Sequence, residues 1–536
     1  MLRRAVISFL AMLALAAQIA AQRAPEKFRV SGKAVNAVNG HPLSGAEVQI
    51  GKADDFDATQ QKMLTADDGS FAFAVTSAGK YMLAGEARGF RRQAFGQHGM
   101  YVSAIVVGQG QSSENVVFRL RPDGRIIGTI VDEEHEPVSG ATVFLFRTDA
   151  SGGLRQTYLS MQIVTDDRGT YRLAHLEPGC YYLVVSAGPW YSSMLLPVDD
   201  NNGGEHGDRR ALEMVYPTTF YPGVTEQASA SQIALNEGED FTADFTLVAE
   251  PGIRVRLNHL NADPQKQRGA TLEQRLFGTR IGQVWQRELP VGDSMEIRNV
   301  APGRYVLDIE SYSANRETRL RVLDLTTDVD VDPDRASTIG PITGIVRVDG
   351  DPNATPSAVL RLWNSRTNEM LDAGIGEKGK LVFNSDLVTP GRYSVFAMTG
   401  ENSTIASLRA TGARIEGQTI EIPGGKPVEL EIVLARGLSK IDGVAQRDGR
   451  PFPGAMILLV PENPEVNLPK FRRDESDNDG TFTLRDVLPG RYKVMAVEDG
   501  WDWEWGNPAL LKKRLEHAQE IEVQPNQTYQ RVVPVE

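Results

Sequence analysis

One short phrase occurs five times along this chain, and its spacing limits what the chain can fold into. The phrase is a turn, a glycine, one variable residue, a tyrosine and then a strand of alternating apolar and polar residues. The five tyrosines are 100, 124, 88 and 99 residues apart; they are Tyr81, Tyr181, Tyr305, Tyr393 and Tyr492. A period of about 100 residues is the length of a β-sandwich domain and is too long for a solenoid repeat.

The residues of this phrase predict how each copy is built. Proline restrains the turn, and glycine takes a backbone conformation that other residues avoid. In the third copy Tyr305, Leu307 and Ile309 share one face of the strand, and Asp308 lies on the other face. We therefore expect each tyrosine to face a core, with its hydroxyl bonded to a backbone group at the edge of its module.

Two further phrases accompany the first. An acidic-Gly turn precedes an aromatic strand at 67–71, 166–171 and 479–482, as in hairpins between antiparallel strands. A Pro-x-x-Gly-Ala phrase opens a strand at 42–46, 137–141 and 451–455. The order of the three phrases resembles the carboxypeptidase regulatory-like domain family. This resemblance implies a transthyretin-like (prealbumin-type) β-sandwich, a fold that also includes starch-binding-like modules.

The predicted fold class is all-β, a tandem array of about five antiparallel β-sandwiches (prealbumin- or immunoglobulin-like) with one short C-terminal helix. That helix would have Asn507 as its N-cap and Pro508 at its first position, and would run through Glu520. The predicted divisions are a signal peptide at 1–21 and modules 1 to 5 at 22–121, 122–249, 250–335, 336–436 and 437–536.

Features of the whole chain indicate export. Arg3 and Arg4 precede an uncharged apolar run, and small residues follow at 19–21, which predicts a signal peptide cleaved before Gln22. No later segment is apolar enough to cross a membrane, so we expect a periplasmic, cell-surface or secreted protein. The net charge of −13 argues against nucleic acid as a partner. The one cysteine, Cys180, cannot form an intrachain disulfide, and strand alternation turns it away from the tyrosine face.

The sequence predicts no catalytic, cofactor-binding or metal-binding residues. His517 and Glu520 have the local spacing of two zinc ligands, but no histidine follows them to complete such a site. Asp474, Asp477 and Asp479 resemble part of a calcium loop, yet the glutamate expected at the twelfth position is missing. Acidic residues of this kind are more often turn formers.

Tryptophans supply the one ligand signal. Trp501, Trp503 and Trp505 alternate with Asp502 and Glu504. On an extended strand the three rings would form a flat platform for stacking sugars, and the acids would accept hydrogen bonds from sugar hydroxyls. The alternative, which we prefer, is that these rings cover the sandwich and are buried.

These patterns favour a non-catalytic scaffold or binding protein of the cell envelope, with another envelope protein or carbohydrate as its partner. The alternatives are a carbohydrate-binding protein that uses the aromatic loops of modules 2 and 5, and an accessory subunit of an extracellular enzyme. The family resemblance does not choose between them, because a fold does not fix a function.

Overall fold

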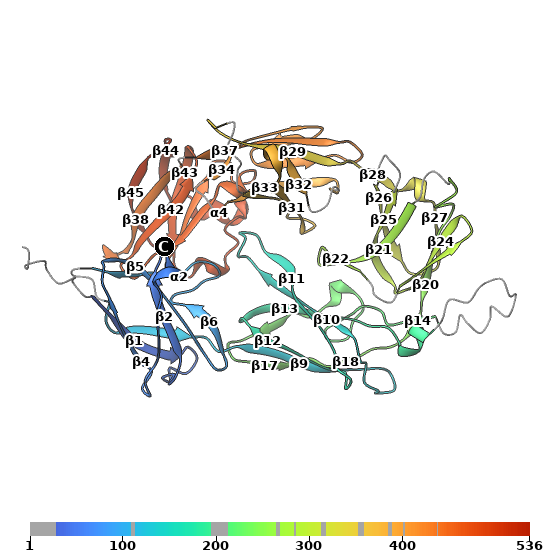
Figure 1. Ribbon diagram of the computed structural model, residues 1–536, viewed down its shortest axis with the longest axis horizontal. Coiled ribbons are helices and arrows are strands. Elements are labelled where there is room, and N and C mark those ends of the chain that lie inside the picture. The colour runs from blue at the N-terminus through green and yellow to red at the C-terminus, as the bar shows by residue number, and fades with distance from the viewer. Residues whose placement is uncertain are drawn as a thin grey trace, which may run out of the picture. The chain divides into compact units, whose positions relative to one another are not determined.

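The computed structural model describes residues 28–108, 113–194, 213–263, 268–282, 286–311, 318–351, 358–383, 388–399, 403–436 and 438–536. The signal peptide predicted at 1–21 lies outside them. The described residues form five successive two-sheet β-sandwiches, which confirms the predicted fold class (Figure 1). The limits of the modules themselves stay a prediction.

Contacts group the chain into two compact units. Unit 1 comprises the described residues up to Pro122 together with 451–454 and 475–481. Unit 2 comprises 123–450, 455–474 and 482–536.

The strands of module 1 form one sheet in the order β4-β1-β8 and a second in the order β3-β2-β5-β6, with β7 on β5. Their bounds are β1 (Phe28–Asn36), β2 (Glu47–Lys52), β3 (Gln61–Leu64), β4 (Ser70–Val75), β5 (Gly79–Ala87), β6 (Phe90–Ala94), β7 (Ile105–Val107) and β8 (Val116–Leu120). A single helical turn, α2 (Phe56–Thr59), follows β2.

Module 2 repeats this plan in the orders β12-β9-β17, with β18 also on β9, and β11-β10-β13-β15, with β16 on β13. The bounds are β9 (Gly124–Val131), β10 (Thr142–Asp149), β11 (Gln156–Val164), β12 (Thr170–Leu176), β13 (Gly179–Ser186), β15 (Thr219–Phe220), β16 (Ile233–Leu235), β17 (Asp240–Thr242) and β18 (Phe245–Thr246). A separate short pair joins β14 (Met214–Val215) to β19 (Glu250–Pro251).

Module 3 has the orders β23-β24-β20-β27 and β22-β21-β25-β26-β28. The bounds are β20 (Ile253–Leu257), β21 (Arg268–Leu276), β22 (Thr279–Gly282), β23 (Arg287–Val291), β24 (Ser294–Val300), β25 (Gly303–Ser311), β26 (Thr318–Leu325), β27 (Val329–Val331) and β28 (Ser337–Ile339).

Module 4 has the orders β29-β37-β34 and β32-β31-β30-β33-β36-β35. The bounds are β29 (Ile342–Val348), β30 (Ala358–Asn364), β31 (Glu369–Ile375), β32 (Leu381–Phe383), β33 (Gly391–Thr399), β34 (Ser403–Thr411), β35 (Arg414–Glu416), β36 (Thr419–Ile422) and β37 (Val428–Arg436).

In module 5, β38 pairs with β45, and β43 lies between β40 and β44. The bounds are β38 (Ser439–Arg447), β39 (Arg450–Pro451), β40 (Met456–Pro461), β41 (Arg472–Glu475), β42 (Thr481–Val487), β43 (Gly490–Val497), β44 (Gln519–Val523) and β45 (Thr528–Pro534).

The first strand of every module pairs in parallel with the closing strands of that module. The parallel pairs are β1–β8, β9–β17, β9–β18, β20–β27, β29–β37 and β38–β45. Glycine in the first strand permits the close approach. A Cβ atom added to Gly32 would lie 1.9 Å from the Val116 carbonyl oxygen, and one added to Gly128 would lie 1.9 Å from that of Ala243.

The repeated tyrosines occupy equivalent positions, as predicted. Each is the third residue of its strand, which begins at the glycine of the phrase. All five side chains are buried. Four hydroxyls donate to the carbonyl oxygen four residues earlier, at 2.7 to 2.9 Å; these are the hydroxyls of Tyr81, Tyr181, Tyr305 and Tyr393. The tyrosines are therefore structural, and burial raises the pKa of the Tyr393 hydroxyl to about 12.

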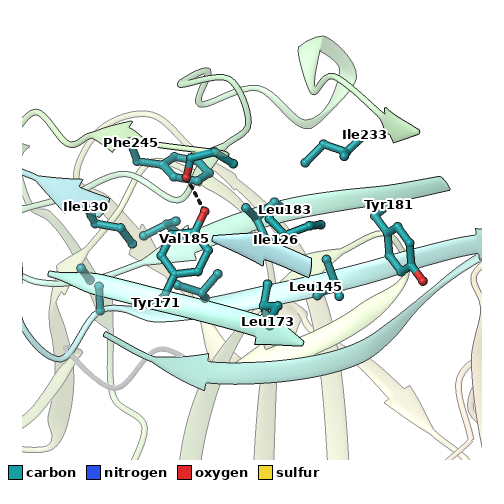
Figure 2. Packing of buried hydrophobic residues seen from close by; sticks show 14 of the residues in the cluster. Ile126, Ile130, Leu145, Tyr171, Leu173, Tyr181, Leu183, Val185, Ile233 and Phe245 are labelled. Atoms are coloured by element: carbon teal, nitrogen blue, oxygen red, sulfur yellow. Dashed lines mark hydrogen bonds between the residues drawn. The ribbon is translucent and has the colours of Figure 1, made fainter. Parts of the chain in front are cut away.

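Each of the first four modules has its own hydrophobic core. Figure 2 shows the core of module 2, where Ile126, Leu145 and Leu183 from different strands meet between the two sheets. The aromatic residue of the acidic-Gly phrase, Tyr171, is buried there, and its hydroxyl donates to the Ala243 carbonyl oxygen. The link between the closing strands β17 and β18 is thus hydrogen-bonded to the core.

The C-terminal helix begins where predicted and ends earlier. Helix α4 (Pro508–Arg514) has Asn507 as its N-cap, whose side chain accepts from the Ala509 amide. The prediction that it runs through Glu520 is wrong, because Gln519–Val523 form β44 and pair with β43. Among the described residues no helix is long and apolar enough to cross a membrane.

Candidate functional site

The segment that carries the three tryptophans is not extended, so their rings do not form one flat platform. Gly500–Asp502 form a 3₁₀ turn, η6, and residues 503–507 continue as bends and turns into α4. Trp505 is 8 % exposed, while Trp501 and Trp503 are half-buried. The alternative arrangement, with rings that cover the sandwich, is the one the structure shows.

Arginine side chains contact the tryptophan rings. The Arg473 guanidinium lies 5.5 Å from the ring centre of Trp501 and 5.0 Å from that of Trp505. Arg514, from the end of α4, lies 4.8 Å from the ring of Trp503. These are cation–π distances, so a sugar would have to compete for these rings with groups of the protein.

The rings belong to a hydrophobic cluster on the outer face of the β40-β43 sheet. Its buried residues in module 5 are Met456, Leu458, Val460, Leu468, Phe471, Met495, Val497, Trp505 and Leu511. Every residue of β40 is buried, so this strand is covered on both of its faces. Part of the cover comes from another module, since Trp363 of β30 is also in the cluster.

A hairpin turn of module 2 also contacts the tryptophan segment within unit 2. The turn, residues 150–155, joins β10 to β11. The Gly506 amide donates to the Gly153 carbonyl oxygen at 2.7 Å, and Arg155 Nε donates to Glu504 Oε1 at 3.0 Å. Leu154 packs against the cluster that contains Trp505. The hydrogen bond from Arg155 lowers the pKa of the Glu504 carboxyl.

Of the five candidate sugar-binding residues, two therefore contact another module. Trp505 and Glu504 contact the 150–155 turn, whereas Asp502 is exposed and Trp503 is half-buried beneath Arg514. The sequence interpretation missed the 150–155 turn. A usable signal was present, because 143–146 and 456–460 are unbroken apolar runs, as in strands buried on both faces.

A hollow of about 420 Å³ lies elsewhere in module 5, lined by the end of β40, by β43, by β44 and by Leu515. None of the five predicted residues lines it. Arg491 is paired with Glu462 at 2.6 Å, and Lys493 lies 3.5 Å from Glu520. Because these charges already have partners, we assign the hollow no ligand.

The residues weighed as metal ligands have other roles. His517 and Glu520 lie beyond the end of α4, so they do not form a pair on one helix face. Asp474 accepts from the Thr483 amide at 2.6 Å, and Asp479 accepts from the Thr481 amide at 3.0 Å. In the part of the chain that the structure describes, no three His, Cys, Asp or Glu side chains are grouped closely enough to hold a metal ion.

Unit 1 contains two buried carboxylates, both in the 475–481 segment. Glu475 accepts from the Ser103 hydroxyl at 2.6 Å. Asp477 accepts from the Ala104 amide at 2.8 Å and is paired with Lys80. Desolvation raises the pKa of the Asp477 carboxyl. Both acids thus accept hydrogen bonds from the 103–104 segment.

The carboxypeptidase regulatory-like domain profile matches residues 125–203, which fall in module 2. No curated protein matches the chain. Solved structures that match include the Bacillus anthracis TIE protein, 11% identical over 95% of this chain and 75% of that one, with a TM-score of 0.17. The minor pilin of Streptococcus agalactiae is 12% identical over 42% of this chain and 96% of that one, with a TM-score of 0.21. The major pilin subunit of Bacillus cereus is 10% identical over 77% and 100%, with a TM-score of 0.15. Scores this low carry no argument about function.

Proposed function

We propose that this chain, which contains a carboxypeptidase regulatory-like domain and has five sandwiches, is a non-catalytic exported scaffold of the cell envelope. One observation carries the proposal. The most ligand-like segment of the sequence, 501–505, is engaged by the 150–155 turn of the same chain, through the Glu504–Arg155 ion pair and the contacts around Trp505. Its aromatic surface therefore supports the assembly of modules.

Burial on both faces of β40 supports the same proposal. Apolar surface removed from water stabilises a contact by roughly 25 cal/mol per Å². A sandwich module without contacts to other modules would expose the outer face of each sheet, and its strands would alternate apolar and polar residues. In β40 all six residues are buried, which is expected of a module that is docked to others.

A carbohydrate-binding protein is the second candidate, on the basis of the aromatic residues that stay accessible. Trp190 is 69 % exposed and lies edge-to-face with Tyr191, at 5.7 Å between ring centres. In module 5, Asp502 is exposed beside the half-buried Trp503. An accessible indole beside hydrogen-bonding side chains is a common element of sugar sites.

Affinity electrophoresis in polysaccharide gels separates the two candidates. The scaffold proposal predicts that the wild-type protein and the Trp503→Ala and Trp190→Ala variants migrate alike in gels with and without polysaccharide. Retardation of the wild type that is lost in one of these variants, with an unchanged melting temperature, would establish the carbohydrate candidate.

Export is tested by expressing the full chain in a bacterium and sequencing the N-terminus of the recovered protein. A mature N-terminus at Gln22 in the periplasmic or extracellular fraction is the expected result. An uncleaved Met1 in the cytoplasmic fraction would contradict the proposal.

A further inference from the structure

The turn between β21 and β22 of module 3 inserts an aromatic ring into the outer face of module 2, within unit 2. The ring belongs to Phe277. It stacks on Tyr182 with 4.7 Å between ring centres, and lies 5.0 Å from Phe146 and 6.0 Å from Phe220. The neighbouring Leu276 is 2 % exposed and belongs to the same hydrophobic cluster.

The socket that receives this ring is made by strands whose other face forms the core of module 2. In β10, Val143 and Leu145 belong to that core, whereas Phe144 and Phe146 belong to the cluster with Leu276. Both phenylalanines are at most 5 % exposed. A strand with apolar residues on both faces needs a cover on each side, and the 276–281 segment supplies part of the second cover.

The backbone of the turn is held in an uncommon conformation. Phe277 has a φ of 47°, in the left-handed region that bulky residues rarely occupy. Its amide donates to Gln227 Oε1 of module 2 at 2.8 Å. The side chain and the backbone of this residue thus both have partners across the junction, which is the kind of surrounding that maintains such a conformation.

Further polar contacts fix the same junction. The Thr218 hydroxyl donates to Gln274 Oε1 at 2.6 Å, and both side chains are buried. The chain between the two modules is itself paired, because β19 bonds to β14. The Gly252 amide also donates to the Glu213 carbonyl oxygen at 2.7 Å, and the Glu213 side chain lies 3.1 Å from Arg298 of β24.

We infer that the socket around Phe146 and Tyr182 is a specific receptor for the 276–278 turn, which locks modules 2 and 3 into one rigid pair. The inference rests on the proposed scaffold function and adds detail to it. Modules 2 and 3 of the scaffold are held at a fixed angle and are not joined by a flexible linker. The occupant is a segment of the same chain. The aromatic contacts pack the turn into the socket, while the Gln227 and Gln274 hydrogen bonds set the orientation.

Distances between spin labels on the two modules test this inference in the full chain. Cys180→Ser removes the native thiol, and Asp167→Cys and Asp324→Cys place labels at exposed positions of modules 2 and 3. Pulsed dipolar spectroscopy should give a single narrow distance peak. Phe277→Asn keeps a residue that tolerates the left-handed backbone and removes the ring, so the narrow peak should be lost. Val322→Ala, an exposed position of module 3, is the matched control and should keep the peak.

Two further measurements keep the test decisive. Labels at Glu288→Cys and Asp324→Cys lie within module 3, and an unchanged distance between them shows that the Phe277→Asn variant is folded. Dilution with unlabelled protein should leave the peak between modules 2 and 3 intact, as a contact within one chain requires. A broad wild-type distribution, a narrow one in Phe277→Asn, or loss of the peak on dilution would each overturn the inference. Polysaccharide retention would instead refute the scaffold function while leaving this lock in place.

Discussion

Replacing Gly153 with alanine should open the contact between the 150–155 turn and the tryptophan segment. Gly153 has a φ of 93°, and a Cβ atom added there would lie 2.9 Å from two atoms of the Trp505 ring. A left-handed backbone costs about 1–2 kcal/mol for a residue with a side chain, and overpacking costs about 1–3 kcal/mol. Trp505 cannot yield easily because it is buried against Phe471, at 5.3 Å between ring centres. We expect the contact to weaken by at least about 2 kcal/mol.

Hydrogen exchange measures this change locally, which matters because a chain of several modules does not unfold in two states. The Gly506 amide donates to Gly153, so a peptide covering 503–507 reports on the contact. A loss of about 2 kcal/mol would speed its exchange by about 30-fold, at 1.36 kcal/mol for each factor of ten. Gly152→Ala is the matched control, because the nearest atom to its added Cβ would be 3.7 Å away. Equal exchange in the two variants would refute the reasoning.

Three further predictions follow from single side chains. Tyr305→Phe should lower the local opening free energy of module 3 by about 1 kcal/mol, because it leaves the buried Ala301 carbonyl without its donor; unchanged hydrogen exchange in a peptide covering 303–311 would argue against a structural hydroxyl. Cys180 is partly exposed and should react rapidly with a thiol reagent in the native protein, whereas protection until denaturation would contradict its outward position. Asp166 has a lowered pKa because Thr170 donates to it, so its stabilising effect is present above the ordinary pKa and is lost as the pH falls below about 4. Asp166→Asn should therefore melt below the wild type at pH 7, and a gap of the same size at pH 2.5 would contradict this assignment.

The fold was predictable because its signals are local and repeated. The glycine and tyrosine of each copy fix a turn, the start of a strand and a buried ring, and these depend only on neighbours in the sequence. Local sequence likewise predicted that Cys180 is partly exposed and that Asn507 is the N-cap of α4. It failed at the end of that helix, since Gln519 and Glu520 take the conformation that pairing with β43 demands.

The contacts between modules were not predicted, because they join residues far apart in the chain. Arg155 and Glu504 are 349 positions apart, and no local pattern links the two segments. The composition of the tryptophan-rich segment 501–505 favoured rings that cover the sandwich, but it did not show that the turn η6 and Leu154 of another module would surround them. Only the apolar runs in β10 and β40 indicated docking between modules. Apolar side chains on the outer face of such a strand need a cover from outside their own sandwich.

The central claim, that the tryptophan segment is a docking surface for the 150–155 turn, is tested most directly by crosslinking these two segments. In a Cys180→Ser background, Arg155→Cys and Glu504→Cys replace an ion pair whose nitrogen and oxygen lie 3.0 Å apart. A short bifunctional thiol reagent applied to dilute protein should join the two positions within one chain, giving a monomer of altered mobility on a denaturing gel and one crosslinked peptide pair by mass spectrometry. Independent labelling of both cysteines, with no crosslink or with crosslinks only between chains, would contradict the claim.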